Sequence, residues 1–229
     1  MKGKIIFVTG TDTGAGKTLL TALMLQNLRS AGIHALAMKP FCSGGRGDVR
    51  LLQSLQKGEL SDAEMNPFYF AKPVAPLAAA RKGKETRLAD AVRAINRIAA
   101  KCDCLLVEGS GGLMVPLGKR FLVCDLIRAL DCSVVIAAKN QLGVINHVLL
   151  TVAMLEEIGL RRSSISLVLM RTATRDASTN SNPRILRELL PKILFGNVGY
   201  LGPKASTGKT VSENASQVDW VRKAIINRL

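Results

Sequence analysis

Residues 10–18, Gly-Thr-Asp-Thr-Gly-Ala-Gly-Lys-Thr, constrain the fold of this chain more than any other segment. They follow the continuous apolar run of residues 4–9, which is typical of a strand covered on both faces. From Thr18 to Ala31 apolar residues recur at helical spacing, and Gly32 is placed as a C-cap. A strand, a glycine-rich turn, a lysine and a hydroxyl at a helix start together predict a phosphate-binding loop.

The spacing of the glycines in this loop departs from the general pattern, because five residues separate Gly10 from Gly16. The same spacing recurs at residues 202–210, but there Pro203 removes a backbone donor and no apolar helix follows. We therefore predict a loop over 202–210, which would at most line the base side of a bound nucleotide.

Strand and helix patterns alternate along the rest of the chain. Strands are predicted over residues 34–38, 104–107, 133–138, 165–170 and 198–201, and helices over 88–100, 122–130, 145–158, 183–190 and 218–228. Repeated strand–helix units predict an α/β fold of the P-loop NTPase type, with a doubly wound, mostly parallel sheet and helices on both faces. Residues 1–229 are predicted to form a single phosphate-loop nucleotide-binding domain. In such sheets, ligands bind at the carboxyl ends of the strands.

The composition narrows the choice of partners. Thirty-two Lys and Arg against seventeen Asp and Glu give a net charge of +15, which favours anionic partners or reflects a basic solvated surface. The basic residues are scattered and aromatics make up only 4% of the chain, so base-stacking platforms are scarce and nucleic acid is not expected as a partner. No apolar stretch is long enough to span a bilayer and the first strand is too short for a signal peptide, so we expect a cytoplasmic protein with no membrane partner. The five cysteines have no paired Cys-x-x-Cys spacing and are predicted to be buried free thiols.

Glu108 marks a second candidate site. It follows the predicted buried strand of residues 104–107 and precedes Gly109, Ser110 and Gly111. A carboxylate at the carboxyl end of a strand beside a phosphate loop is placed to meet Mg²⁺. Taken by itself, a glutamate at a strand end could equally cap a turn.

Three further polar residues follow the second predicted strand, namely Lys39, Ser43 and Asp48. Asp48 alone is the pattern of a helix N-cap, and Lys39 alone that of a solvated strand end. Because carboxyl ends of parallel strands share one edge of the sheet, we expect these residues to meet the phosphate loop. Two lysines with three groups that can bind magnesium predict a phosphoryl-transfer site, formed by Lys17, Lys39, Thr18, Asp48 and Glu108.

These motifs together resemble those of ATP-dependent dethiobiotin synthetases. The resemblance covers residues 4 to about 160, and the five-residue glycine spacing is that family's own form. The matching segments are Val8–Thr13 with Gly16-Lys17-Thr18, Lys39-Pro40 with Ser43-Gly44, Asn66-Pro67, Ala75-Pro76, Val107–Gly112 and Leu142–His147.

The resemblance implies a reaction in which one amine of 7,8-diaminopelargonate takes up CO₂ as a carbamate. ATP then phosphorylates the carbamate, and the second amine closes the ring of dethiobiotin. ATP and Mg²⁺ are the implied cofactors, and the implied assembly is a homodimer.

The resemblance also assigns roles to residues. Thr13, Lys17 and Lys39 are the implied catalytic residues, and Mg²⁺ would be held by Thr18, Asp48 and Glu108. The implied nucleotide contacts are Gly14, Ala15, Gly16, Lys17, Thr18, Leu19, Asp48, Glu108, Gly109, Ser110 and Gly111. The implied substrate contacts are Ser43 and the turn Gly143, Val144, Ile145 and Asn146, a helix start that would receive the substrate carboxylate across the dimer interface.

This chain departs from the family pattern at three places. Gly14 replaces an acidic residue common in the loop, Gln141 stands where a lysine often assists the carboxylate, and residues 167–172 lack the asparagine that reads the adenine edge. The last departure leaves the base selectivity open, so other nucleoside triphosphates are candidate substrates.

Two other classes of protein share some of these features. A ParA/MinD-type ATPase switch has the same fold, but it carries a signature lysine where this chain has Asp12. It also needs a membrane or DNA interface, for which the positive charge is mild support. A nucleic-acid-binding module would explain the charge and leave Lys39, Ser43 and Glu108 without a role.

Overall fold

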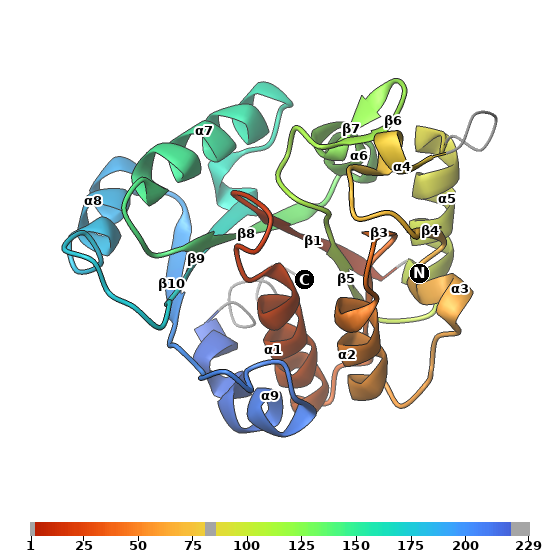
Figure 1. Ribbon diagram of the computed structural model, residues 1–229, viewed down its shortest axis with the longest axis horizontal. Helices are drawn as coiled ribbons and strands as arrows, with labels where there is room; N and C mark the ends of the chain where they lie inside the picture. The colour runs from red at the N-terminus through yellow and green to blue at the C-terminus, as the bar shows by residue number, and fades with distance from the viewer. Residues whose placement is uncertain (1–2, 81–85, 221–229) are drawn as a thin grey trace.

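Strand β1, Lys4–Gly10, lies in the middle of a six-stranded sheet in this computed structural model, which describes residues 3–80 and 86–220 (Figure 1). The strand order is β10-β9-β8-β1-β5-β2, and every pair is parallel. The other strands are β2 Ala35–Met38, β5 Cys104–Glu108, β8 Ser133–Lys139, β9 Ile165–Met170 and β10 Leu194–Val198. The chain adds β5 and β2 on one side of β1 and β8 to β10 on the other, so the strand order reverses at β1. That switch point is where open parallel sheets bind ligands.

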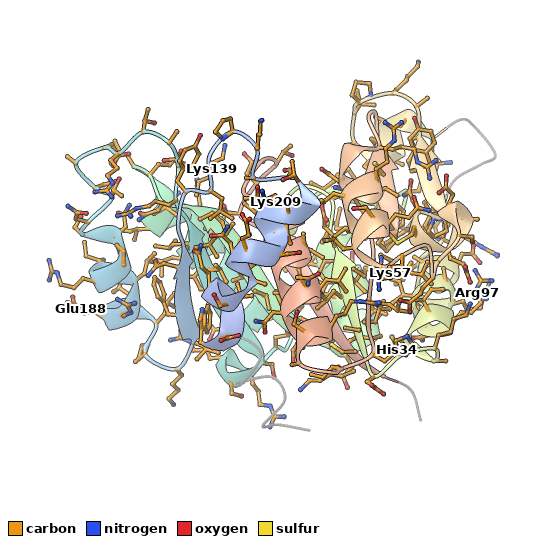
Figure 2. The ribbon with its side chains drawn as sticks, turned by 90° about the horizontal axis from the view of Figure 1, so that it is seen from below. His34, Lys57, Arg97, Lys139, Glu188 and Lys209 are labelled. Atoms are coloured by element: carbon orange, nitrogen blue, oxygen red, sulfur yellow. The ribbon has the colours of Figure 1, made fainter. Side chains whose placement is uncertain are left out.

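Helices cover both faces of this sheet. On one face α1 packs with α2 and α9, and on the other α7 packs with α8 and α5 with α6 (Figure 1). Figure 2 shows the first of these faces, with α9 beside α1. The α-helices are α1 Lys17–Ser30, α2 Gly47–Leu55, α3 Asp62–Met65, α4 Pro76–Ala79, α5 Leu88–Ala99, α6 Val123–Leu130, α7 Val144–Glu157, α8 Asn182–Leu189 and α9 Gly208–Asn214. Short 3₁₀ turns lie at η1 Arg162–Ser164 and η2 Ala215–Val218.

The central strands are apolar because helices cover them on both sides. Ile6, Val8, Leu105 and Leu106 are fully buried, and so is Leu20 on the facing side of α1. These side chains belong to one continuous hydrophobic core. The predicted doubly wound parallel sheet is therefore confirmed, and continuous apolar runs rather than alternating ones are what such strands require.

Two small two-stranded sheets that we did not predict lie at the carboxyl edge of the main sheet. The first pairs β3, Phe41–Ser43, with β4, Phe68–Phe70, in parallel. The second is a hairpin of β6, Pro116–Gly118, and β7, Phe121–Leu122. Strands of two or three residues carry no hydrophobic period, so they cannot be recognised from sequence patterns. They matter because β3 carries Ser43.

The structure corrects several boundaries near the C-terminus. The strand predicted over residues 198–201 is β10, which instead ends at Val198. Its apolar run is interrupted by Gly196, where a Cβ atom would lie 1.9 Å from Cζ2 of Trp220, so only glycine fits there. The helix predicted over 218–228 begins in the 3₁₀ turn η2, and its residues 221–228 lie outside the described part of the chain.

The loop predicted over residues 202–210 is wrong in its last part, because α9 begins at Gly208. Thr207 is its N-cap, and the Thr207 side chain accepts a hydrogen bond from the N–H of Thr210. Threonine is a preferred N-cap residue, so Thr207 is the local signal for this helix start. None of the helices in the described part of the chain has the length and apolar character needed to cross a membrane.

Candidate active site

The loop between β1 and α1 has the backbone shape of a phosphate cradle. Gly14 and Gly16 have φ of +72° and +98°, a conformation that residues with a Cβ rarely adopt. A Cβ atom on Gly16 would also lie only 3.0 Å from Cγ of Met170, at the end of β9. The loop therefore requires glycine at this position both for its dihedral angles and for its packing against the neighbouring strand.

Lys17 lies inside this loop. Its Nζ donates to the carbonyl of Asp12 at 3.0 Å, so the side chain curls back over the turn, and only 7% of the residue is exposed. Burial lowers the pKa of Lys17 to about 8, although the nearby carboxylate of Glu108 acts in the opposite direction. An anion held by the loop would supply the counter-charge that this buried ammonium lacks.

Glu108 joins the loop to the next strands. Its Oε1 accepts hydrogen bonds from the Thr18 hydroxyl and from Lys39 Nζ, both at 2.7 Å. Lys39 also contacts the carboxylate of Asp48, which lies in the first turn of α2. The residue at the N-cap of α2 is Arg46, so Asp48 is not the cap that its sequence context alone suggested.

Lys39 is buried between two carboxylates. Burial alone would lower the pKa of Lys39, but Glu108 and Asp48 outweigh burial and raise its pKa above the ordinary value. The side chain of Glu108 is fully buried and that of Lys39 is 9% exposed, while 45% of the Asp48 side chain is exposed. Lys39 is therefore a fixed and nearly buried positive charge.

The residues around Lys39 hold its backbone in place. The Lys39 N–H donates to the carbonyl of Met65, and the side-chain amide of Asn66 donates to the Lys39 carbonyl at 2.9 Å. Beyond Lys39, the ring of Phe41 stacks on that of Phe68 with centroids 4.8 Å apart. The resemblance pointed to Asn66 without a reason, and the structure supplies one.

A cavity of about 590 Å³ opens over these groups at the carboxyl edge of the sheet. The side chain of Ser43 lines it, and its Oγ is buried with no hydrogen-bond partner in the described part of the chain. Among the predicted site residues, the cavity is lined by Thr13, Gly14, Gly16, Lys17, Thr18, Leu19, Lys39, Ser43, Asp48, Glu108, Ser110 and Gly111. The structure thus brings together residues from four separate segments of the chain.

Other cavity-lining residues were not predicted as site residues. Cys42 and Gly45 belong to the same segment as Ser43, residues 73–76 form one wall, and Ser206 belongs to the loop that precedes α9. Ala75 and Pro76 carried part of the resemblance, which was the available signal for that wall. The contribution of Ser206 depends on α9 packing against α1, which no local pattern indicates.

Six predicted residues do not line this cavity. Ala15 is buried within the loop, and Gly109 packs against Phe7, where a Cβ atom would lie 2.8 Å from Cε1. Gly143 precedes α7 with φ of +90°, and Val144, Ile145 and Asn146 form the first turn of that helix. Val144 is buried, and its N–H donates to the carbonyl of Gln141.

The oxygen donors in the cavity fit a magnesium ion. Oε2 of Glu108 is buried and has no hydrogen-bond partner in the described structure, and the Thr18 hydroxyl and the Asp48 carboxylate face the same cavity. No group of three or more His, Cys, Asp or Glu side chains that could hold a metal occurs within residues 3–80 and 86–220. Two carboxylates and a hydroxyl suit Mg²⁺, which normally completes its shell with water and phosphate oxygens.

The chain is similar in sequence to known proteins. A family profile described as "AAA domain" matches residues 4–206. An ATP-dependent dethiobiotin synthetase of Bacillus licheniformis is 37% identical over 86% of this chain and 85% of its own length. Namesakes from Anaeromyxobacter dehalogenans and Methanococcus vannielii are 42% and 39% identical, over 75% and 68% of this chain and 78% and 74% of their own lengths.

Solved structures support the fold. MinD in a MinC:MinD complex from Aquifex aeolicus matches with a TM-score of 0.65 at 15% identity, covering 96% of each chain. A ParA family ATPase from Chlorobium tepidum matches with a TM-score of 0.59 at 16% identity, covering 96% of this chain and 98% of its own. At these identities the likeness shows a shared P-loop NTPase fold and carries no statement about activity.

Proposed function

The chain belongs to the family of ATP-dependent dethiobiotin synthetases, and on that premise we propose that it uses ATP and CO₂ to convert 7,8-diaminopelargonate to dethiobiotin. The observation that carries the proposal is the meeting of Lys17, Lys39 and Glu108 at one cavity beside the phosphate loop. A simple phosphate-binding loop needs Lys17 alone. A second buried lysine beside it suits an enzyme that brings a second anion to the nucleotide.

The proposed chemistry has three steps. One amine of the substrate attacks CO₂ and loses a proton, which leaves a carbamate. A carbamate oxygen then attacks the γ-phosphorus of ATP, the bond to the β-phosphate oxygen breaks, and ADP leaves. The second amine attacks the resulting carbamoyl phosphate, so that phosphate departs, the amine loses a proton and the ureido ring closes.

In this scheme the loop residues hold the nucleotide. Backbone N–H groups of residues 14–19 would cradle the phosphates, with Thr13 and Lys17 at the end that faces the acceptor. Lys17 already lies buried inside the loop, which supports this role. The catalytic contribution is positioning together with neutralisation of charge that develops as phosphate transfers.

Lys39 and Ser43 are the proposed contacts of the second anion. Lys39 retains its charge because of Glu108 and Asp48, so it can orient a carbamate against the γ-phosphate. The buried Ser43 hydroxyl, which has no partner among the described residues, is free to bond the substrate. Thr18, Asp48 and Glu108 would hold Mg²⁺, which when bound neutralises phosphate oxygens.

We further propose a homodimer built on α7. Leu142, just before α7, and Leu150, within it, are 79% and 62% exposed, so a second copy of the chain could cover them. The N–H groups of Ile145 and Asn146 in the first turn have no partner within the helix, so they are placed to receive the substrate carboxylate from the neighbouring subunit. A cytoplasmic location stays a prediction.

The decisive test measures phosphate release by the purified protein with ATP, with and without diaminopelargonate and bicarbonate. We expect release to require both and to match dethiobiotin formation one to one. ATP turnover that does not require diaminopelargonate and that rises with DNA or lipid vesicles would instead establish the ATPase switch. Replacing Leu150 with Glu should convert a dimer to a monomer in light scattering. Lys57→Gln, an exposed position in the turn after α2 and far from α7 in sequence, serves as a surface control.

A further inference from the structure

Lys139 lies at the mouth of the phosphate loop, beside Gly14. An ideal Cβ atom on Gly14 would lie 3.6 Å from Nζ of Lys139, the last residue of β8. Glycine has no side chain to fill this position, so the ammonium group of Lys139 can approach the backbone of the loop. Figure 2 shows Lys139 at the same edge of the molecule as Lys209, which lies in the first turn of α9.

The end of β8 that carries Lys139 is connected to the loop at two points. The N–H of Thr11 donates to the carbonyl of Ala137 at 3.1 Å, which attaches the start of the loop to β8. Lys139 itself pairs in register with Met170, and the side chain of Met170 packs beneath Gly16. The lysine therefore keeps its place relative to the loop, and only its side chain has freedom to move.

The positive charge of Lys139 is not paired with another group in the described structure. The residue is exposed, and its ammonium has no ion pair or hydrogen bond with the residues described here. By contrast, Lys17 is bonded within the loop and Lys39 is held by two carboxylates. A phosphate chain held by the loop would lie well within a Debye length of Lys139, about 8 Å at physiological salt, so the attraction would be only partly screened.

We propose that Lys139 is a phosphate-binding residue of the nucleotide site, which binds the nucleotide from outside the loop while Lys17 binds it from within. It contacts the phosphate chain of a nucleoside di- or triphosphate and has no part in selecting the base. The inference rests on the nucleotide-binding part of the proposed function and not on the identity of the second substrate.

Arg171 provides a matched control on the same edge. It follows β9 directly, as Lys139 ends β8, and it is also exposed. It lines a different cavity, of about 340 Å³, together with Asn140 and Asn180. A general effect of positive charge at this edge would therefore involve Arg171 as much as Lys139, whereas a direct phosphate contact would involve Lys139 alone.

The test is equilibrium binding of adenosine, AMP, ADP and ATP to the full-length protein, without diaminopelargonate, at low and high salt. We expect Lys139→Gln to weaken ATP binding about tenfold, the loss of one partly screened charge contact. The loss should be smaller for ADP, absent for adenosine and reduced at high salt. Lys139→Arg should restore most of the affinity, and Arg171→Gln should leave it unchanged.

ATP affinity within twofold of wild type in Lys139→Gln would overturn the proposal, and so would equal losses in Lys139→Gln and Arg171→Gln. An unchanged unfolding temperature shows that each variant is folded, as expected at exposed positions. Because no amine substrate is present, the result is independent of the synthetase reaction. A protein that fails to make dethiobiotin but loses ATP affinity in Lys139→Gln would refute the proposed function and leave this inference standing.

Discussion

Lys39 Nζ lies 2.7 Å from Oε1 of Glu108, and the same oxygen accepts the hydroxyl of Thr18. One carboxylate thus connects the phosphate loop, through Thr18, to the segment that follows β2. A change at either member of the Lys39–Glu108 pair is expected to alter charge on both sides of the cavity. Substitutions of the two residues are nevertheless expected to have different effects, because their proposed roles differ.

Replacing Lys39 with Ala should abolish ring formation and leave nucleotide binding in place. Lys39 is proposed to face the carbamate, while Lys17 and the loop backbone hold the phosphates. We expect a fall in kcat of at least about 10²-fold, typical for loss of a group that stabilises transferring charge. The rate of dethiobiotin formation gives kcat, and calorimetric titration with ATP gives the affinity for the nucleotide.

Lys57→Ala is the control for this experiment, because Lys57 is exposed and lies outside the cavity. It should retain wild-type activity. Full activity in Lys39→Ala would remove Lys39 from the mechanism, and loss of ATP binding in that variant would reassign it to the nucleotide.

Replacing Glu108 with Gln should destabilise the fold as well as the activity. Lys39 would keep only the half-exposed Asp48 as a counter-charge, so a buried ammonium would be poorly compensated. Removing one partner of a buried ion pair costs about 3 kcal/mol or more. Urea denaturation should show this loss in the free energy of unfolding, and an unchanged midpoint would contradict the buried pairing.

Replacing Gly16 with Ala should deform the phosphate loop. The residue has φ of +98°, and a Cβ atom would lie 3.0 Å from Met170 Cγ. Left-handed backbone strain costs about 1–2 kcal/mol before the close contact is counted. We expect ATP binding to fall by about tenfold or more for such a cost. Gly32→Ala, at another positive-φ glycine with open space around it, isolates the dihedral strain from the packing.

A comparison of ATP, GTP and CTP tests the base site. Residues 167–172 lack the asparagine with which the family reads adenine. Within this segment the side chain of Met170 is buried against Gly16, where it offers no hydrogen bond to a base. We therefore expect kcat/KM for the three nucleotides to lie within about tenfold, the discrimination that apolar contacts alone provide. A preference for ATP above about 10³-fold would point to an adenine-reading group elsewhere in the site.

The buried cysteines should make the free energy of unfolding depend on pH. Burial raises the pKa of Cys104 to about 12 and that of Cys102 to about 11, from an ordinary value of 9.0. Both thiols thus keep their protons in the folded state at pH values where the unfolded chain releases them. The free energy of unfolding should fall as pH rises through the range from about 9 to about 12.

Thiol labelling checks the same groups. At pH 8 the native protein should react slowly at Cys102 and Cys104, and denaturant should expose all five free cysteines. Mass spectrometry of the labelled peptides resolves the sites. Rapid native labelling of Cys104 at pH 8 would mean that this thiol is not buried in solution.

Much of the fold was predictable because its signals are local. The run of residues 4–9, the glycine turn and the periodic helix behind it each follow from neighbouring residues, and together they require a parallel crossover. The predicted helix over residues 88–100 and α5, Leu88–Ala99, differ by one residue, within the usual scatter at helix ends. Glu108 was predictable because it ends a buried strand next to such a loop.

The sequence by itself determined that this chain folds as a doubly wound sheet with a phosphate loop, and it carries the residues that we propose as a phosphoryl-transfer site. Only the tertiary structure decided how those residues pair. Three contacts depend on strand order: Lys39 lies between Glu108 and Asp48, Met170 packs under Gly16, and Lys139 lies beside Gly14. Strand order places β8 and β5 on either side of β1. These segments are distant in sequence, so no local residue pattern in any of them indicates which of the others it contacts.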